Sequence, residues 1–87
     1  MNSFKLTVSS PDGDLFRGDV TVLSLRGIEG DLAIMAGHIP FITAVKPCDC
    51  HVEFPEGPAR TGHTEGGLLT VGADSVTLLS GSFKWVD

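Results

Sequence analysis

The side chains in this sequence that could bind a metal ion or undergo redox chemistry are two cysteines and the histidines around them: Cys48, Cys50, His51, His63 and His38. Thiolates and imidazoles are ligands that zinc prefers, but structural zinc sites usually separate paired cysteines by two to four residues. Here a single residue separates them, so on an extended strand Cys48 and Cys50 share one face while His51 points to the other. We therefore interpret both cysteines as small core residues. The alternative is a small cytosolic metal-binding or redox β-module that uses Cys48, Cys50 and His51, with His63 nearby.

No local motif for nucleotide or nucleophilic chemistry occurs in the sequence. It contains neither G-x-x-x-x-G-K-[ST] nor G-x-G-x-x-G, and no G-x-S-x-G element marks a nucleophilic serine. Two pairs of carboxylates, Asp12 with Asp14 and Glu29 with Asp31, lie in predicted turns, where we interpret them as solvated because a raised pKa requires burial. The sequence therefore predicts a non-catalytic protein without a cofactor or a metal.

Length and composition indicate one small acidic domain, spanning residues 1–87. Eleven acidic and six basic residues give a formal charge of −5, which disfavours sequence-independent nucleic-acid binding because that mode needs a basic surface. The hydrophobic share of 41% favours a packed globule. No stretch approaches the roughly 18–20 apolar residues of a membrane span, and the N-terminus lacks the apolar centre of a secretion signal. We expect a soluble, cytosolic domain with reduced cysteines, which leaves a position on a membrane complex open.

The elements that must position these residues are strands, because apolar and polar residues alternate along most of the chain. The alternating or extended segments are residues 4–8, 15–17, 20–25, 31–35, 41–45, 48–54, 66–71 and 75–79. A change of phase at Val22 and Leu23 indicates a β-bulge or burial of both faces. Residues 55–65 are predicted to form a mobile turn, and residues 83–87 to extend the last strand or cover an edge. The fold class is therefore all-β, a sandwich or barrel of roughly eight to ten short strands.

The loop from Gly27 to Asp31 is the strongest candidate for a binding surface. It presents Glu29, Asp31 and the exposed-looking Ile28 between glycines, and loops on rigid scaffolds commonly carry binding sites. Its carboxylates would favour a basic partner, although simple solvation is the competing interpretation. A lone histidine beside a turn, such as His38, is either hydrogen-bonded structure or a contact residue.

Residues 30–47, GDLAIMAGHIPFITAVKP, resemble the segment G-[ED]-[LFM]-G-I-L-P-x-H-x-P-L-[LIV]-T-x-L-x-P-G of the epsilon subunit of F-type ATP synthases, called delta in mitochondria. Residues 6–20 are similar to that family's opening pattern, and residues 66–79 to its closing pattern. The resemblance covers nearly the whole chain in order. Ala33 and Ala36 replace the usual glycine and proline, Cys48 stands at a usual glycine, and residues 54–65 follow no pattern of the family.

The resemblance implies a ten-stranded β-sandwich, or flattened barrel, in a non-catalytic subunit of the rotor's central stalk. Such a subunit binds the gamma subunit, rests on the membrane c-ring and helps couple proton flow to ATP synthesis. A peripheral location at the cytoplasmic face of the bacterial cell membrane follows, with membrane contact only through the complex. The residues that match the family's contact positions are Glu29, Gly30 and Asp31 for the c-ring, and Ser10, His38 and Thr43 for the gamma subunit.

Many members of the family continue into a C-terminal helical hairpin that regulates ATP hydrolysis and, in some, binds ATP. Because the sequence ends at Asp87, we expect neither hairpin-type inhibition nor an ATP site in this chain. A natural short form and a truncation at the domain boundary both fit the sequence. It also leaves open the choice between proton and sodium coupling and the oligomeric state of the free domain.

Overall fold

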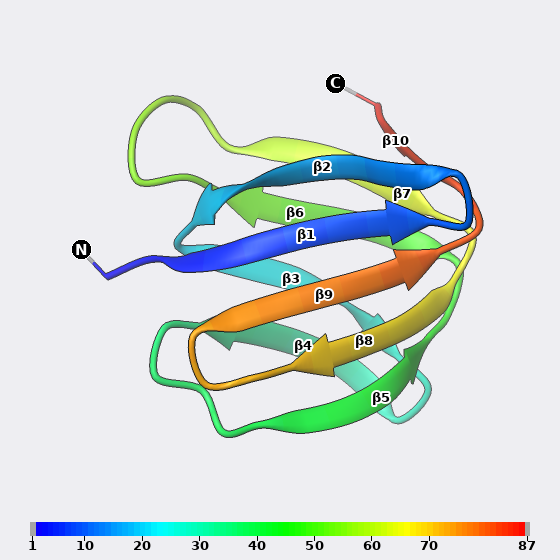
Figure 1. The fold of residues 1–87 in the computed structure, drawn as a ribbon, viewed down its shortest axis with the longest axis horizontal. Helices are drawn as coiled ribbons and strands as arrows, with labels where there is room; N and C mark the ends of the chain where they lie inside the picture. Colours follow the sequence, from blue (N-terminus) through cyan, green and yellow to red (C-terminus); the bar gives the residue numbers. More distant parts are fainter. Residues whose placement is uncertain (1, 87) are drawn as a thin grey trace.

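The computed structural model describes residues 2–86 and is built from strands joined by short turns (Figure 1). The strands are β1 (Phe4–Ser10), β2 (Gly13–Val20), β3 (Val22–Gly27), β4 (Gly30–Met35), β5 (Phe41–Val45), β6 (Cys48–Glu53), β7 (Arg60–Thr64), β8 (Gly67–Val71), β9 (Ser75–Ser80) and β10 (Phe83–Trp85). The predicted all-β fold of about ten strands is confirmed. Within residues 2–86, no helix is long and apolar enough to span a bilayer.

The strands form one continuous sheet that folds over on itself into two layers. Neighbours along the sheet follow the order β10-β7-β6-β3-β5-β8-β9-β1-β2, and β4 pairs with β3 beside this path. In Figure 1 the layer of β2, β1, β9, β8 and β5, here called the front sheet, faces the viewer. The layer of β4, β3, β6, β7 and β10, the back sheet, lies behind it. The layers join where Gly27 at the end of β3 pairs with Val45 at the end of β5.

The core fills the space between the two layers, and it follows from the alternation of side chains along each strand. In β8, for example, Leu69 and Val71 are buried while Leu68 and Thr70 face outward. The fully buried large side chains come from both sheets: Leu6, Leu23, Leu69, Leu78, Val8, Val20, Val52 and Val76. Each such side chain stabilises the fold by about 1.5–3 kcal/mol relative to an exposed one.

An aromatic cluster covers the open edge of the sandwich between β2 and β10. The ring of Phe16 on β2 meets Trp85 on β10 edge to face at 5.4 Å between centroids. Phe54 approaches Phe16 at 6.1 Å, and Phe83 approaches Trp85 at 5.3 Å. The guanidinium of Arg60 lies 4.1 Å from the centre of the Trp85 ring, a cation–π geometry. The last strand thus covers an edge, one of the two predicted possibilities for this segment.

The prediction of a mobile turn over residues 55–65 is wrong in its second half, because Arg60–Thr64 forms strand β7. The inward positions of β7 are Gly62 and Thr64, neither of which is apolar, so no hydrophobic alternation marks the strand. Gly62 is required there because an added Cβ would lie 2.3 Å from the ring of Phe83. The Thr64 hydroxyl is satisfied by Ser80, with the two oxygens 2.6 Å apart.

The change of phase at Val22 and Leu23, for which a β-bulge or burial of both faces was predicted, is not a β-bulge, because the pairing of β3 with β4 is regular there. Strand β2 ends at Val20 and β3 begins at Val22, so the change of phase marks a strand break at Thr21. Val20 and Thr21 are both buried, and the backbone N–H of Thr21 donates to the carbonyl of Glu53 at 2.7 Å. A register shift lies instead in the β1–β2 pairing, where Val8 pairs with Phe16 but Ser9 pairs with Asp14, which leaves Leu15 of β2 without a partner in β1.

Candidate functional site

The candidate binding loop is the tip of the β3–β4 hairpin. Gly27 and Gly30 face each other across the hairpin, leaving Ile28 and Glu29 as a two-residue tip that is exposed to solvent. Gly30 has φ of +132°, a conformation that residues with a Cβ rarely adopt. The N–H of Ile28 donates to the carbonyl of Ala44 on β5 at 3.2 Å, so the tip is anchored to the front sheet. The tip is therefore a rigid platform for one apolar and one acidic side chain.

Asp31 does not belong to that tip, contrary to the prediction that it lies in a turn. It is the second residue of β4 and stands directly opposite Arg26 on β3. The Arg26 Nε–H donates to Asp31 Oδ1 at 2.9 Å, and this hydrogen bond, with the Asp31 charge, raises the pKa of Arg26. The turn assignment is equally wrong for Asp14, which lies in β2 and pairs with Arg17 at 2.6 Å.

A hollow of about 350 Å³ opens between β4 and β5, beside the tip. It brings Thr43, a predicted gamma-binding residue, next to the three predicted ring-binding residues. The lining residues are Gly27, Glu29, Gly30, Asp31, Leu32, Phe41, Ile42 and Thr43. Two groups that the sequence assigns to different partners thus meet at one corner of the sandwich.

The other two predicted gamma-binding residues lie at opposite ends of β1. The ring of His38 packs edge to face on Phe4 at the start of the strand, at 5.4 Å between centroids. Both ring nitrogens of His38 are buried and have no hydrogen-bond partner among the described residues. Ser10 ends the strand, where its hydroxyl accepts from the N–H of Asp12 at 3.2 Å. Since a strand rises about 3.3 Å per residue, Ser10 and His38 do not form one cluster.

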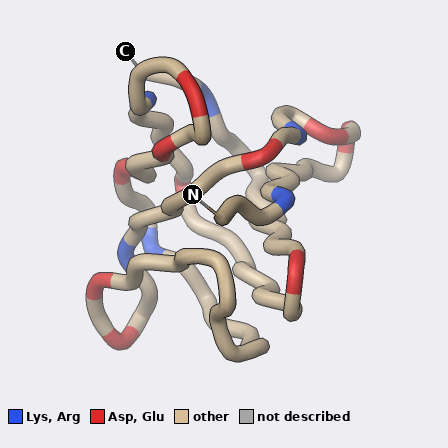
Figure 2. The backbone as a smooth tube through the Cα atoms, turned by 90° about the vertical axis from the view of Figure 1, so that its left-hand side faces the viewer, with Lys and Arg blue, Asp and Glu red and all other residues tan. Residues whose placement is uncertain are grey.

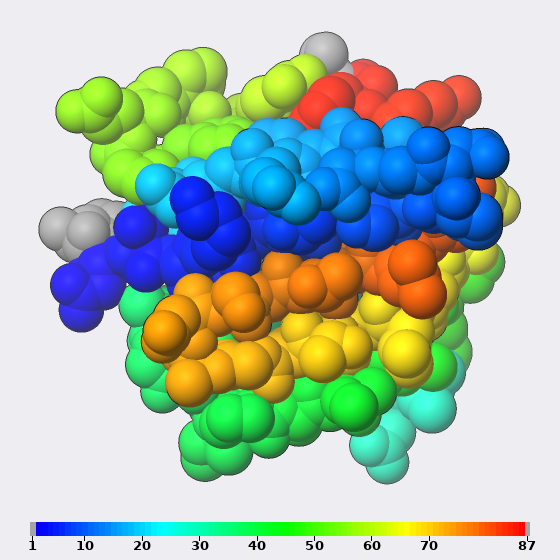
Figure 3. Space-filling view, in the orientation of Figure 1, coloured from blue at the N-terminus to red at the C-terminus, as the bar shows by residue number. Residues whose placement is uncertain are grey.

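An exposed apolar row crosses the outer face of the front sheet and was missed in the sequence. It consists of Ile42, Ala44, Leu68 and Leu79; in register, Ala44 on β5 pairs with Leu68 on β8, which pairs with Leu79 on β9. Ile42, Leu68 and Leu79 are 66%, 42% and 49% exposed. Figure 3 views this face, over which β5, β8, β9, β1 and β2 lie side by side. The signal was present, because Leu68-Leu69 and Leu78-Leu79 place leucine on both faces of a strand.

The outer face of the back sheet carries a group of charged side chains beside a smaller apolar pair, the 56%-exposed Met35 on β4 and its neighbour Val22 on β3. We call Asp49, His51, Glu53, His63 and Glu65 the charged ladder. His63 Nδ1 lies 2.9 Å from Asp49 and its Nε2 lies 2.6 Å from Glu65, while His51 lies 3.4 Å from Glu53. The hydrogen bonds to Asp49 and then Glu65 raise the pKa of His63. Figure 2 shows acidic and basic positions interleaved around the chain instead of gathered into a patch of one sign.

The cysteines do not form a metal site. Cys50 is buried in the core, as predicted, and burial, followed by the neighbouring Cys48, raises its thiol pKa to about 12. Cys48 is only half-buried, and its sulfur accepts a hydrogen bond from the Arg26 N–H at 3.4 Å. His51 is exposed on β6 and points away from the buried Cys50. Among the residues that the structure describes, no three His, Cys, Asp or Glu side chains are arranged to hold a metal ion, so nothing supports the metal-binding alternative.

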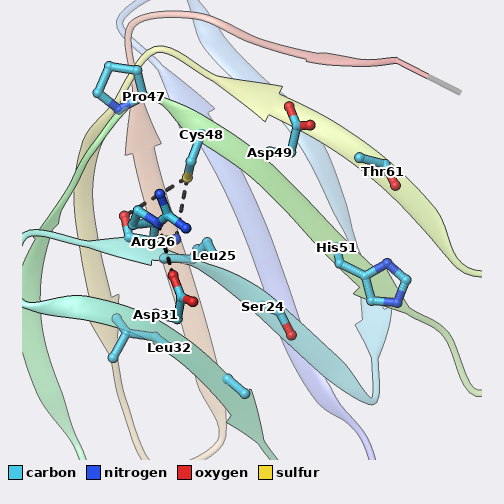
Figure 4. Close-up of a pocket in the computed structure, with 11 residues that line it drawn as sticks. Ser24, Leu25, Arg26, Asp31, Leu32, Pro47, Cys48, Asp49, His51 and Thr61 are labelled. Carbon is cyan, nitrogen blue, oxygen red and sulfur yellow. Dashed lines mark hydrogen bonds and ion pairs between the residues drawn. The ribbon is translucent and has the colours of Figure 1, made fainter.

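A groove of about 610 Å³ runs over the outer face of the back sheet between β4 and β7 (Figure 4). Asp31 and Arg26 point toward each other at one side of it, and Asp49, His51 and Thr61 lie along the other. Asp31 therefore borders this groove as well as the hollow beside the tip, whereas Glu29 lines only the hollow.

Comparison with known proteins gives consistent matches over this sandwich. A family model described as the beta-sandwich domain of the ATP synthase delta/epsilon chain matches residues 3–86. The ATP synthase epsilon chain of Clostridium perfringens is 33% identical over 85 residues. A chain in the mitochondrial ATP synthase of Euglena gracilis (OSCP/F1/c-ring) superimposes with a TM-score of 0.88 at 21% identity. A chain in the central stalk/c-ring structure of the Tetrahymena thermophila mitochondrial ATP synthase gives 0.80 at 14% identity.

The matches cover most of this chain but only part of the relatives. The Clostridium alignment covers 98% of this chain and 64% of that protein. The Euglena and Tetrahymena superpositions cover 98% and 92% of this chain, and 56% and 64% of theirs. At these identities the two solved structures show the fold alone.

Proposed function

This chain belongs to the ATP synthase delta/epsilon family through its β-sandwich domain, and we propose that it is a non-catalytic subunit of the central stalk of an F-type ATP synthase. In this role it links the gamma subunit to the membrane c-ring and helps couple proton flow to ATP synthesis. The observation that carries the proposal is the family match over residues 3–86, which takes in all ten strands. The epsilon chain of Clostridium perfringens, similar along 98% of this chain, supports it.

The apolar row is the proposed contact with the gamma subunit. Exposed apolar side chains that adjoin one another across strands are typical of a surface that is covered in a complex. Thr43, a predicted gamma-binding residue, follows Ile42 in β5 and lines the same hollow, but it pairs with the buried Leu69 and so lies on the opposite face of the strand from the row. His38 and Ser10 stay proposed contacts at the two ends of β1, and a gamma subunit that touches both must span the length of the front sheet.

The end of the β3–β4 hairpin is the proposed contact with the c-ring, through Glu29 of the tip and through Gly30 and Asp31 at the start of β4. The tip projects at one end of the sandwich, as Figure 1 shows, and its backbone is held by the pairing of β3 with β4. A rigid tip with an exposed carboxylate suits a polar, basic loop, because opposite charge speeds association and fixes the docking register. The chain would then reside peripherally at the cytoplasmic face of the bacterial membrane, attached through the complex.

Co-purification tests the proposed function. A tagged version of the chain, expressed with the gamma subunit of the same organism, is expected to elute as a stoichiometric complex from gel filtration under native conditions. Glu29→Lys combined with Asp31→Lys is expected to leave that complex intact while lowering proton-driven ATP synthesis in membrane vesicles. Failure to bind the gamma subunit would contradict the rotor assignment, whereas unchanged synthesis in the double variant would refute only the ring contact.

A further inference from the structure

The two acidic residues of the proposed ring contact differ in their surroundings. Asp31 is held by Arg26, its directly opposite neighbour on β3, with 2.9 Å between Nε and Oδ1. Glu29, at the tip, has no ion pair or hydrogen bond through its side chain within residues 2–86. The tip therefore presents one unpaired negative charge, while the charge of Asp31 is balanced inside the hairpin.

The backbone of Arg26 is hydrogen-bonded on both sides, to Cys48 and to Lys46. Its N–H donates to the sulfur of Cys48, and its carbonyl accepts from the N–H of Lys46 at 3.1 Å. These bonds hold the backbone of Arg26 at the junction of β3 with β5 and β6. The Arg26 side chain extends from there toward Asp31. The Arg26 and Asp31 side chains are nevertheless 61% and 79% exposed, so a partner could reach the pair.

We propose that Arg26 competes from within the chain for Asp31, so that docking of a basic partner at the hairpin tip depends chiefly on Glu29. The inference rests on the proposed contact with the c-ring and concerns which residues regulate it. A cationic side chain of the partner reaches Glu29 without displacing anything. To use Asp31 it must first displace the guanidinium of Arg26, which offsets most of the attraction. Arg26 is therefore a positioning residue: by pairing with Asp31, it leaves Glu29 as the carboxylate of the hairpin that a partner can bind.

A double-mutant cycle separates this competition from a simple sum of charges. The probe is a detergent-solubilised c-ring that carries its gamma subunit, and the measurement is the dissociation constant of the whole chain at low salt. Glu29→Gln is expected to weaken binding by about fivefold and Asp31→Asn by less than about twofold, the range of exposed charge pairs. In an Arg26→Gln background, where Asp31 is released, Asp31→Asn is expected to weaken binding by about fivefold.

Glu56→Gln is the matched control, because Glu56 is also an exposed turn carboxylate but lies in the β6–β7 loop at the other end of the sandwich (Figure 1). It should leave binding unchanged. If Asp31→Asn weakens binding of the otherwise unchanged chain as much as Glu29→Gln does, the inference is overturned. If the chain does not bind the assembly at all, the proposed function fails first and the inference falls with it.

A second measurement tests the ion pair without any partner. The Arg26 Nε–H signal in a ¹⁵N NMR spectrum should exchange slowly with water in the unmodified chain and faster in the Asp31→Asn variant. Equal exchange in the two proteins would show that Arg26 does not hold Asp31 in solution, and would overturn the inference even if docking occurs.

Discussion

The two outer faces of the sandwich cover the same core but expose different kinds of side chain to solvent. On the front sheet, the apolar row of Ile42, Ala44, Leu68 and Leu79 faces solvent without a charge among its members. On the back sheet, the charged ladder pairs its histidines with carboxylates at 2.6–3.4 Å. Both sheets bury their inward side chains, so the difference between the two faces lies in the outward positions.

The difference indicates that only one face is meant to stay in water. Charged outward side chains keep a sheet solvated, and an exposed apolar patch on a small domain marks a surface for a partner. We therefore propose the front sheet as the docking face for the gamma subunit and the back sheet as the face left in solvent.

The largest contrast is between Leu69 and Leu68, which are neighbours in β8 but point to opposite sides. Leu69→Ala leaves a cavity in the core and is expected to lower the free energy of unfolding by about 2–5 kcal/mol. Leu68→Ala removes an exposed side chain and should change it by about 0.5 kcal/mol or less. Urea unfolding of the two variants measures both values. Equal losses would mean that the apolar row is part of the packing and not a docking surface.

A charge in the apolar row should abolish most of the gamma contact while the fold persists. Leu68→Asp is expected to weaken binding of the purified gamma subunit by about thirtyfold, the effect of losing a central interface residue. Isothermal titration calorimetry provides the measurement. Leu15→Asp is the matched control, because Leu15 is an exposed leucine on β2, outside the row. If both variants bind equally well, the gamma subunit docks elsewhere.

The buried hydroxyl pair that connects the two sheets should matter for stability and not for docking. Thr64 on β7 and Ser80 on β9 share a hydrogen bond of 2.6 Å, and Ser80 also donates to the carbonyl of Ser82 at 2.8 Å. Thr64→Val removes this bond and also leaves the Gly66 N–H, which donates to the Thr64 hydroxyl at 3.1 Å, without its acceptor, so it is expected to cost about 1–3 kcal/mol in thermal or urea unfolding. Thr64→Ser keeps the hydroxyl and should recover the hydrogen bond. No difference between the two variants would contradict the role of this bond.

The smallest expected effect is a pH dependence of the solvent face. Asp49 and Glu65 raise the pKa of His63 above that of the unfolded chain, so the imidazolium stabilises the folded state. That stabilisation is fully present below about pH 6.5, the ordinary histidine value, and disappears as the pH rises through the folded pKa. Urea unfolding between pH 5.5 and 9 should show this decline, and His63→Gln should remove it. His51→Gln leaves His63 and its two carboxylates in place and should retain it.

Much of the fold could be predicted because most strands alternate apolar and polar residues. The 75–79 strand and its hairpin with 66–71, for instance, reappear as β9 and β8. Strand β7 could not be found this way, because neither of its inward residues is a large apolar one. Gly62 leaves room for the ring of Phe83, and the hydroxyl of Thr64 is hydrogen-bonded to that of Ser80. Both requirements arise from residues far along the chain.

The candidate site was predicted less completely than the fold. Glu29 lies at an exposed tip as expected, but Asp31 was placed in a turn although it pairs with Arg26 across the hairpin. Counting residues outward from a two-residue tip would have placed those two opposite each other. The apolar row was missed because, in each pair of adjacent leucines, only the leucine that faces the core was considered. Whether the outward leucines of two strands lie next to each other depends on the register between the strands, which the sequence does not give.

Site-specific photo-crosslinking tests the division into a docking and a solvent face most directly. A photoreactive amino acid is placed at the position of Leu68 in the apolar row and, in a second protein, at that of His51 in the charged ladder. Each protein is irradiated with the gamma subunit. A crosslinked product is expected from position 68 and none from position 51. A product from position 51 alone would show that the charged back sheet, and not the front sheet, is the docking face.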